Sequence, residues 1–232
     1  MARETLDTVG AARATRRTAL RIIAAWIILP LFFLATGGSL GWWEAWVYCA
    51  ILLCPMTLFL VHMIRRDPEF IARRLQLREK ERTQRRILVW GYPALIGALV
   101  IPGLDHRCGW SAPPLAVVIG ALAVALGGYL MVLRVFLENR WAGRTVETYA
   151  GQQVISTGPY AIVRHPMYVG AMLMYLATPV ALGSWWALLP ALLIVPILIA
   201  RILNEEKVLV ENLPGYRAYT QKTHYRLIPG VW

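Results

Sequence analysis

The stretch LAVVIGALAVALGGYLMVLRVFL, residues 115–137, is 23 residues long and contains one charged side chain, Arg134. About 20 apolar residues in a helix cross the ~30 Å hydrocarbon core of a bilayer. Inside lipid a spanning segment has to satisfy its own backbone polar groups, which a single helix does. The stretch therefore predicts a transmembrane helix. With the similar segments around it, it predicts an all-α polytopic membrane protein.

Five further apolar segments accompany it, at 22–40, 45–64, 87–104, 167–183 and 185–203. Each is close to the length that a membrane helix needs. The last two are joined only by Gly183 and Ser184, and the segment 167–183 contains Pro179. They predict a tight helical hairpin over 167–203. Six spanning helices, or five with a re-entrant hairpin, both fit the pattern.

The composition excludes several classes of protein. Hydrophobic residues make up 58% of the chain and charged residues 16%, which does not fit a water-soluble enzyme or a disordered tail. The three cysteines, at 49, 54 and 108, form an odd set without CxxC spacing. No disulfide framework and no metal site are expected.

The net charge of +11 indicates topology rather than a nucleic-acid partner. Five basic residues precede the first span, nine lie between residues 65 and 86, and Arg107 alone lies in the loops of the opposite side. The positive-inside rule then places both termini in the cytoplasm. The first apolar segment, which lacks a small-residue cleavage site, is interpreted as a retained span.

Three regions follow from this pattern. Residues 1–21 form a basic cytosolic N-terminus, and residues 22–137 contain the first four spans with the basic inner-face loop 65–86. That loop interleaves apolar and charged residues, which fits either a topological anchor or a surface helix that contacts anionic lipid. Residues 138–232 contain a polar motif loop, the hairpin 167–203 and a cytosolic tail, so the chemistry is expected there.

The first polar cluster is STGPYAIVRHPMYVG, residues 156–170. Gly158-Pro159 predicts a turn, and Pro166 suits the first turn of a helix. Arg164 and His165 stand beside the positive end of that helix, where an anion such as a carboxylate or phosphate is favoured. The alternative is that these residues mark the interface end of a span.

The second cluster follows the sixth apolar segment. Arg201 and Glu205 are four residues apart and share a helix face, whereas Glu206 is turned by about 100°. Acids at the membrane end of a helix are costly unless they are hydrated or bound, so at least one is expected to face a polar cavity. They fit an ammonium, ribose hydroxyls or a sulfonium. Simple hydration of both acids is the alternative.

Together, GPYAIVRHPMYVG (158–170) and NEEKVLVENLPGYRAYTQKTHYRLIPG (204–230) resemble the isoprenylcysteine carboxyl methyltransferase family and its phospholipid methyltransferase relatives. The resemblance covers roughly residues 120–232. It implies an S-adenosylmethionine-dependent methyltransferase with a cofactor pocket on the cytosolic side and a lipidic acceptor that arrives laterally from the bilayer. It also implies Arg201, near the acceptor, and Glu205 as catalytic residues. The residues that it assigns to the cofactor pocket are Gly158, Pro159, Tyr160, Arg164, His165, Tyr168, Glu205 and Glu206.

Two other functions compete with this expectation. Membrane sterol reductases, which use NADPH, have a similar GPY...RHPxYxG segment and a tail like HYRLIPGVW, but they need more spans than this chain has. A non-enzymatic membrane binding protein is the second alternative. The Arg- and Ala-rich composition favours a bacterial plasma membrane. The methyl acceptor, carboxyl against amine methylation and the oligomeric state are left open by the sequence.

Overall fold

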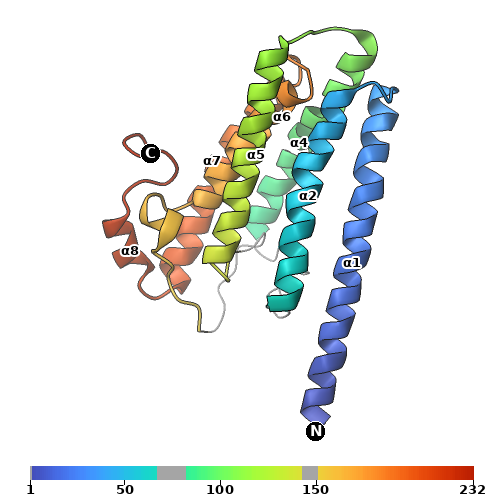
Figure 1. Ribbon diagram of the computed structural model, residues 1–232. Helices are drawn as coiled ribbons and strands as arrows, with labels where there is room; N and C mark the ends of the chain where they lie inside the picture. The colour runs from blue at the N-terminus through green and yellow to red at the C-terminus, as the bar shows by residue number, and fades with distance from the viewer. Residues whose placement is uncertain (1, 67–81, 143–150) are drawn as a thin grey trace.

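A computed structural model describes residues 2–66, 82–142 and 151–232, with side chains from residue 15 onward. The described residues are helical, with no strand among them (Figure 1). This confirms the prediction of an all-α fold. The elements are α1 (Ala2–Gly37), α2 (Trp43–Arg66), α4 (Arg82–Cys108), α5 (Leu115–Glu138), the 3-10 helix η1 (Gly158–Ala161), α6 (Pro166–Ala181), α7 (Leu188–Asn212) and α8 (Tyr216–Lys222).

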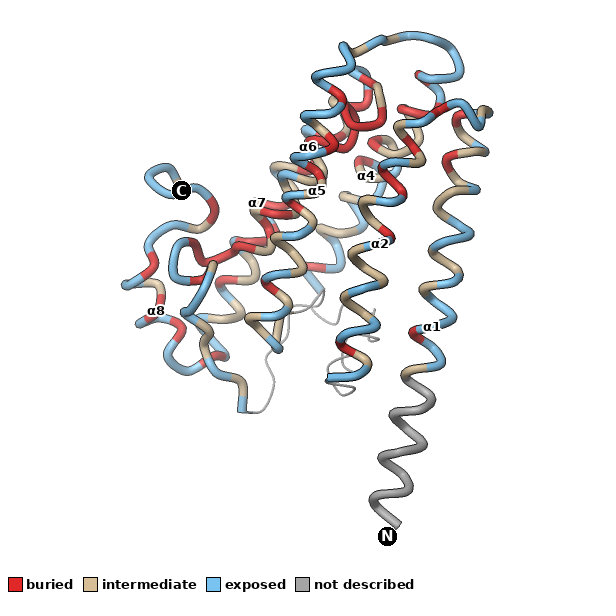
Figure 2. Tube along the Cα trace, in the orientation of Figure 1, coloured by how far each residue is buried: buried red, intermediate tan, exposed pale blue. Residues whose placement is uncertain are grey.

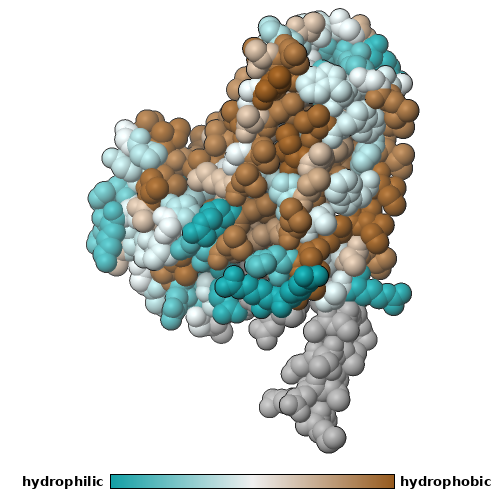
Figure 3. All heavy atoms as spheres, viewed as in Figure 1, coloured by the Kyte–Doolittle hydropathy of each residue, from teal (hydrophilic) through white to brown (hydrophobic). Residues whose placement is uncertain are grey.

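Five of these helices are long and apolar enough to cross a membrane: α1 from Thr15, α2, α4, α5 and α7. The chain is therefore an integral membrane protein. Hydrophobic side chains cover the middle of the bundle, and hydrophilic ones gather along its lower edge (Figure 3). Helix α6 has 16 residues, which at 1.5 Å per residue is about 24 Å and shorter than the hydrocarbon core. It pairs with α7 as the predicted hairpin.

The chain alternates between two ends of the bundle (Figure 1). We call the end that contains Arg66, Arg82 and Glu138 the basic end, because α2 ends and α4 begins there with arginines. Arg107 lies at the opposite end, as the charge pattern predicts. Much of the segment 65–86 and residues 143–150 of the motif loop lie outside the described residues. The cytoplasmic position of the basic end stays a prediction.

The core near the opposite end joins the first two helices to the hairpin. Phe33, Trp42 and Tyr48 are buried together there, and the Trp42 indole donates to the carbonyl oxygen of Leu182 at 3.2 Å. Buried positions concentrate in this region and around the tail, while most of α1 from Thr15 onward is exposed or intermediate (Figure 2). His106 stacks on Trp42 with ring centroids 5.2 Å apart.

A buried carboxylate fixes the loops at this same end. Asp105 is fully buried and accepts hydrogen bonds from the backbone N–H of Ser111 at 2.7 Å and from the hydroxyls of Ser111 and Ser184. These contacts connect the end of α4 to the α5 approach and to the α6–α7 connection. Because three hydrogen bonds satisfy its oxygen atoms, the buried carboxyl group is not left without polar partners.

Two glycines let α5 and α6 approach closely. A Cβ atom at Gly128 would lie 2.5 Å from the carbonyl oxygen of Gly170, and a Cβ at Gly170 would lie 2.5 Å from that of Gly128. Small residues at such crossings allow membrane helices to pack backbone against backbone. This contact fixes the beginning of α6, where the first polar cluster ends, against the middle of α5.

Candidate functional site

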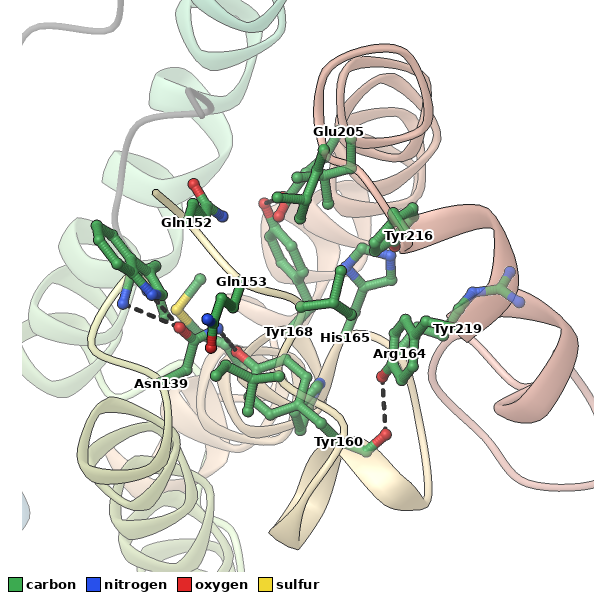
Figure 4. Close-up of a pocket in the computed structure, with 18 residues that line it drawn as sticks. Asn139, Gln152, Gln153, Tyr160, Arg164, His165, Tyr168, Glu205, Tyr216 and Tyr219 are labelled. Carbon is green, nitrogen blue, oxygen red and sulfur yellow. Dashed lines mark hydrogen bonds between the residues drawn. The ribbon is translucent and has the colours of Figure 1, made fainter. Parts of the chain in front are cut away.

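A polar pocket lies at the basic end, beside the bundle (Figure 4). Its walls come from the end of α5, the segment 152–155, η1, the start of α6, the end of α7 and α8. Eighteen residues line it. The arginine, histidine and glutamate side chains among them are Arg164, His165 and Glu205; the others are amides, aromatic residues and apolar residues.

The GPY segment forms the turn that brings Tyr160 to the pocket. Gly158 has a φ of +56°, a conformation that glycine adopts readily, and it packs against the carboxylate of Glu138. Tyr160 is buried, and its hydroxyl accepts a hydrogen bond from the Asn139 side chain at 3.0 Å. Gly158 and Pro159 thus shape the backbone, whereas Tyr160 lines the pocket.

His165 and Pro166 begin α6, as the sequence predicts. His165 is the N-cap residue and Pro166 stands in the first turn. The backbone N–H groups of Arg164 and His165 donate to the carbonyl oxygens of Tyr225 and Arg226 at 2.8 and 3.0 Å. The C-terminal tail therefore runs along the motif and holds its backbone in place.

Glu206 is the acceptor at the centre of a buried ion cluster. Its carboxylate accepts from Nε of Arg164 at 2.7 Å and from Nε of Arg226 at 2.8 Å, and lies 3.2 Å from Nε2 of His165. The guanidinium of Arg164 also donates to the carbonyl oxygens of Thr223 and His224. The anion beside the start of α6 is thus a side chain of the protein itself.

A second chain of hydrogen bonds leads from α7 through α6 to the pocket. Nε of Arg201 donates to the Tyr168 hydroxyl at 2.8 Å, and that hydroxyl donates to Oε2 of Glu205 at 2.6 Å. Arg201 and Tyr168 are buried, while Glu205 is half-buried and lines the pocket. The arginine therefore supports the carboxylate through the phenol.

Two tyrosines of α8 close one side of the pocket. The Tyr219 hydroxyl donates to the carbonyl oxygen of Tyr160 at 2.7 Å. The Tyr216 hydroxyl is buried and has no hydrogen-bond partner among the described residues. Burial, reinforced by the charges of Glu206 and Glu205, raises the pKa of Tyr216 well above its usual value. Burial also raises the pKa of Tyr219, to about 12. Both phenols are neutral over the ordinary pH range.

Neutral residues form the other side. Asn139, Gln152 and Gln153 lie there, away from Tyr216 (Figure 4). Trp141, whose backbone N–H donates to the Asn139 side chain, lines the pocket as well. The Asn139 side-chain oxygen accepts from the backbone N–H groups of Trp141 and Ala142 at 2.9 and 3.1 Å. This turn directs the chain around the pocket mouth.

The structure brings together the two polar clusters of the sequence, which are some forty residues apart. Five of the predicted site residues line one pocket: Tyr160, Arg164, His165, Tyr168 and Glu205. The remaining candidates, which do not line it, are Gly158, Pro159, Arg201 and Glu206.

Sequence reasoning did not assign Trp141, Gln152, Gln153, Tyr216 or Tyr219 to the site. Two sequence signals could have identified four of them: the adjacent glutamines shortly before STGPY, and the two tyrosines three residues apart in the tail. The tyrosine spacing puts both rings on one helix face.

A bundle of apolar helices with a pocket of polar side chains at its basic end defines an integral membrane protein with a candidate ligand site at one end of its helices. Residues 115–214 match the family model of phospholipid methyltransferases. This model describes the family of isoprenylcysteine carboxyl methyltransferase-like membrane methyltransferases, and residues 115–214 of the chain are similar to it. No curated protein shows a significant match to the chain.

Proposed function

We propose that the protein is an S-adenosylmethionine-dependent methyltransferase that acts on a lipidic or isoprenoid-linked acceptor at the cytosolic face of the membrane. One observation carries the proposal: the matched residues 115–214 include every residue that lines the pocket except Tyr216 and Tyr219. The polar pocket thus belongs to the region that the methyltransferase family shares. The match favours methyl transfer over the reductase alternative.

The pocket residues fit this cofactor by their chemistry. One side offers the carboxylate of Glu205 and the imidazole of His165, which suit the charged amino-acid part of the molecule. The other side offers amides and Trp141, which suit ribose hydroxyls and a flat base. The Tyr216 hydroxyl is a buried polar group that still needs a partner. Tyr160, Arg164 and Tyr168 complete the set, with Gly158 and Pro159 as the turn that presents Tyr160.

When bound, the cofactor supplies a methyl group on a sulfonium, which passes to the acceptor as the carbon–sulfur bond breaks and its electron pair returns to sulfur. Such a displacement depends mainly on proximity, alignment and exclusion of water. The protein's part is then to position the two reactants, and a covalent nucleophile is not needed.

Glu205 is the pocket residue that we propose to contact the reactants. Its Oε2 atom accepts a hydrogen bond from the Tyr168 hydroxyl, and that hydroxyl accepts one from Nε of Arg201. This arrangement holds the carboxylate in one orientation, so it can bind an ammonium or a hydroxyl without moving. Arg201 lies behind Tyr168, so we propose it as a positioning residue. Glu206 belongs to the ion cluster that fixes Arg164 and His165 and would close the pocket from behind.

The acceptor is proposed to be a membrane lipid or a lipidated small molecule with a carboxylate or an amine. The pocket lies near the start of α6 and the polar end of α7. The rest of α6 is largely apolar, and α7 is apolar from Leu188 to Ala200, within the helix that is long enough to span a membrane. A lipid chain in the bilayer therefore has a short path to the pocket. The proposed location is a bacterial plasma membrane with both termini in the cytoplasm.

A binding titration tests the proposed function directly. We would titrate the detergent-solubilised full-length protein with S-adenosylhomocysteine by calorimetry, with NADPH in parallel. The matched variants are His165→Ala and Glu205→Gln. Binding of S-adenosylhomocysteine that weakens about tenfold or more in the variants is expected, because each removes a polar contact in a desolvated site.

Each result has a distinct meaning. Binding of NADPH without S-adenosylhomocysteine would transfer the protein to the reductase class. Binding of neither ligand would favour the second alternative, a non-enzymatic membrane binding protein. Equal S-adenosylhomocysteine affinity in wild type and both variants would move the cofactor out of this pocket.

A further inference from the structure

Helix α8 presents two tyrosines that are nearly equivalent in position and different in hydrogen bonding. Tyr216 and Tyr219 are both buried, both line the pocket, and their ring centroids are 5.7 Å apart. The Tyr219 hydroxyl donates to the carbonyl oxygen of Tyr160. The Tyr216 hydroxyl, on a residue that is 4% exposed, has no hydrogen-bond partner among the described residues.

A buried hydroxyl without a partner is unfavourable and uncommon in folded proteins. A phenylalanine would fill the same space without leaving a polar atom unsatisfied. Because Tyr216 borders a pocket, the simplest partner is a group of the molecule that binds there.

The charges around Tyr216 indicate which part of that molecule it meets. Glu205, Glu206 and Arg164 are the charged groups that act on its hydroxyl. Every charged residue of the pocket lining lies on this side, whereas the glutamines and Asn139 lie on the other (Figure 4). Arg164 and His165 already bond to Glu206. A ligand with one charged end is therefore expected to direct that end toward Glu205 and Tyr216.

We infer that the Tyr216 hydroxyl hydrogen-bonds the amino-acid end of the bound S-adenosyl cofactor, beside Glu205. This inference rests on the proposed function and adds a contact outside the matched region 115–214. A neutral phenol can accept from the α-ammonium through its oxygen and donate to the α-carboxylate through its hydrogen.

Two single-atom variants test the assignment in the full-length, detergent-solubilised protein: Tyr216→Phe, and Tyr219→Phe as the matched control. The probes are S-adenosylhomocysteine and methylthioadenosine, which has the same nucleoside and thioether but lacks the amino-acid end. Tyr216→Phe should weaken S-adenosylhomocysteine about tenfold and leave methylthioadenosine unchanged. The melting temperature of the unliganded Tyr216→Phe protein should be equal to the wild-type value or higher. Tyr219→Phe should lower it, because the Tyr160 carbonyl oxygen loses its shorter hydrogen bond and keeps only the one from the Thr223 hydroxyl at 3.4 Å.

The outcomes separate this inference from the proposed function. Wild-type protein that does not bind S-adenosylhomocysteine would overturn both. Wild-type binding with equal affinity in Tyr216→Phe would overturn only the inference. Equal losses for both probes would place the hydroxyl at the nucleoside and would overturn its assignment to the amino-acid end.

Discussion

Glu206 gives the sharpest test of how this site is held together. Replacement by Gln removes the negative charge that faces Arg164, His165 and Arg226 at 2.7, 3.2 and 2.8 Å. The side chains of Arg164 and His165 are 7% and 4% exposed, so water cannot easily replace the lost partner. Breaking a buried ion pair from one side costs about 3–5 kcal/mol. At about 2–4 °C per kcal/mol for a chain of this size, the melting temperature should fall by about 6–20 °C.

Thermal unfolding followed by tryptophan fluorescence in detergent measures this change. Glu211→Gln is the matched control, because Glu211 lies on the same helix and is exposed. It should shift the free energy of unfolding by no more than about 0.5 kcal/mol. A Glu206→Gln protein that melts with the wild type would show that the cluster does not stabilise the fold, and our account of Glu206 would be wrong.

Three further changes probe other parts of the molecule. Glu205→Gln should leave the melting temperature within about 2 °C of wild type, because the residue is half-buried and a glutamine oxygen can still accept the Tyr168 hydroxyl. Methyl transfer in a radiolabel assay should nevertheless fall at least tenfold; normal turnover would mean that both acids are structural. Gly128→Ala should destabilise the protein by about 1–3 kcal/mol, since its Cβ would lie 2.5 Å from the Gly170 carbonyl oxygen; a wild-type thermal melt would mean that the helices separate easily. Burial raises the pKa of Tyr219 to about 12, from about 10 in the unfolded chain. The stability that this neutral phenol contributes should therefore be complete below pH 10 and lost as pH rises through 12. Tyr219→Phe should flatten that decline in thermal melts between pH 9 and 12, and an identical slope in the variant would refute this prediction.

The fold could be predicted from the sequence because a run of apolar residues by itself indicates a membrane helix. Each of the long apolar runs became a helix, and the short run with Pro179 became the short helix α6. The ends of the helices were less accurate. The apolar run 185–203 became Leu188–Asn212, because NEEKVLVEN is polar yet favours helix, and hydropathy marks only the apolar part of such a helix.

The site was partly predictable for a different reason. The sequence Arg164-His165-Pro166 indicates the start of a membrane helix. Charged groups at such a position are costly, so they commonly serve a function. The two adjacent acids show the limit of such reasoning. A rotation of about 100° separates Glu205 from Glu206, but the sequence does not say which one faces the pocket. Packing decides it: Glu206 meets Arg164 and Arg226, and Glu205 meets Tyr168.

The tail explains why the site extends beyond the family match, which ends at residue 214. The carbonyl oxygen of Trp232 accepts three backbone N–H groups, from Arg226, Leu227 and Ile228, at 2.9 to 3.1 Å. The Arg226 guanidinium also lies over the Trp232 ring at 5.1 Å. This compact turn presents Nε of Arg226 to Glu206 while its backbone bonds to the motif at His165. The tail thus supports the pocket without lining it, because it fixes the ion cluster that holds the lining residues Arg164 and His165.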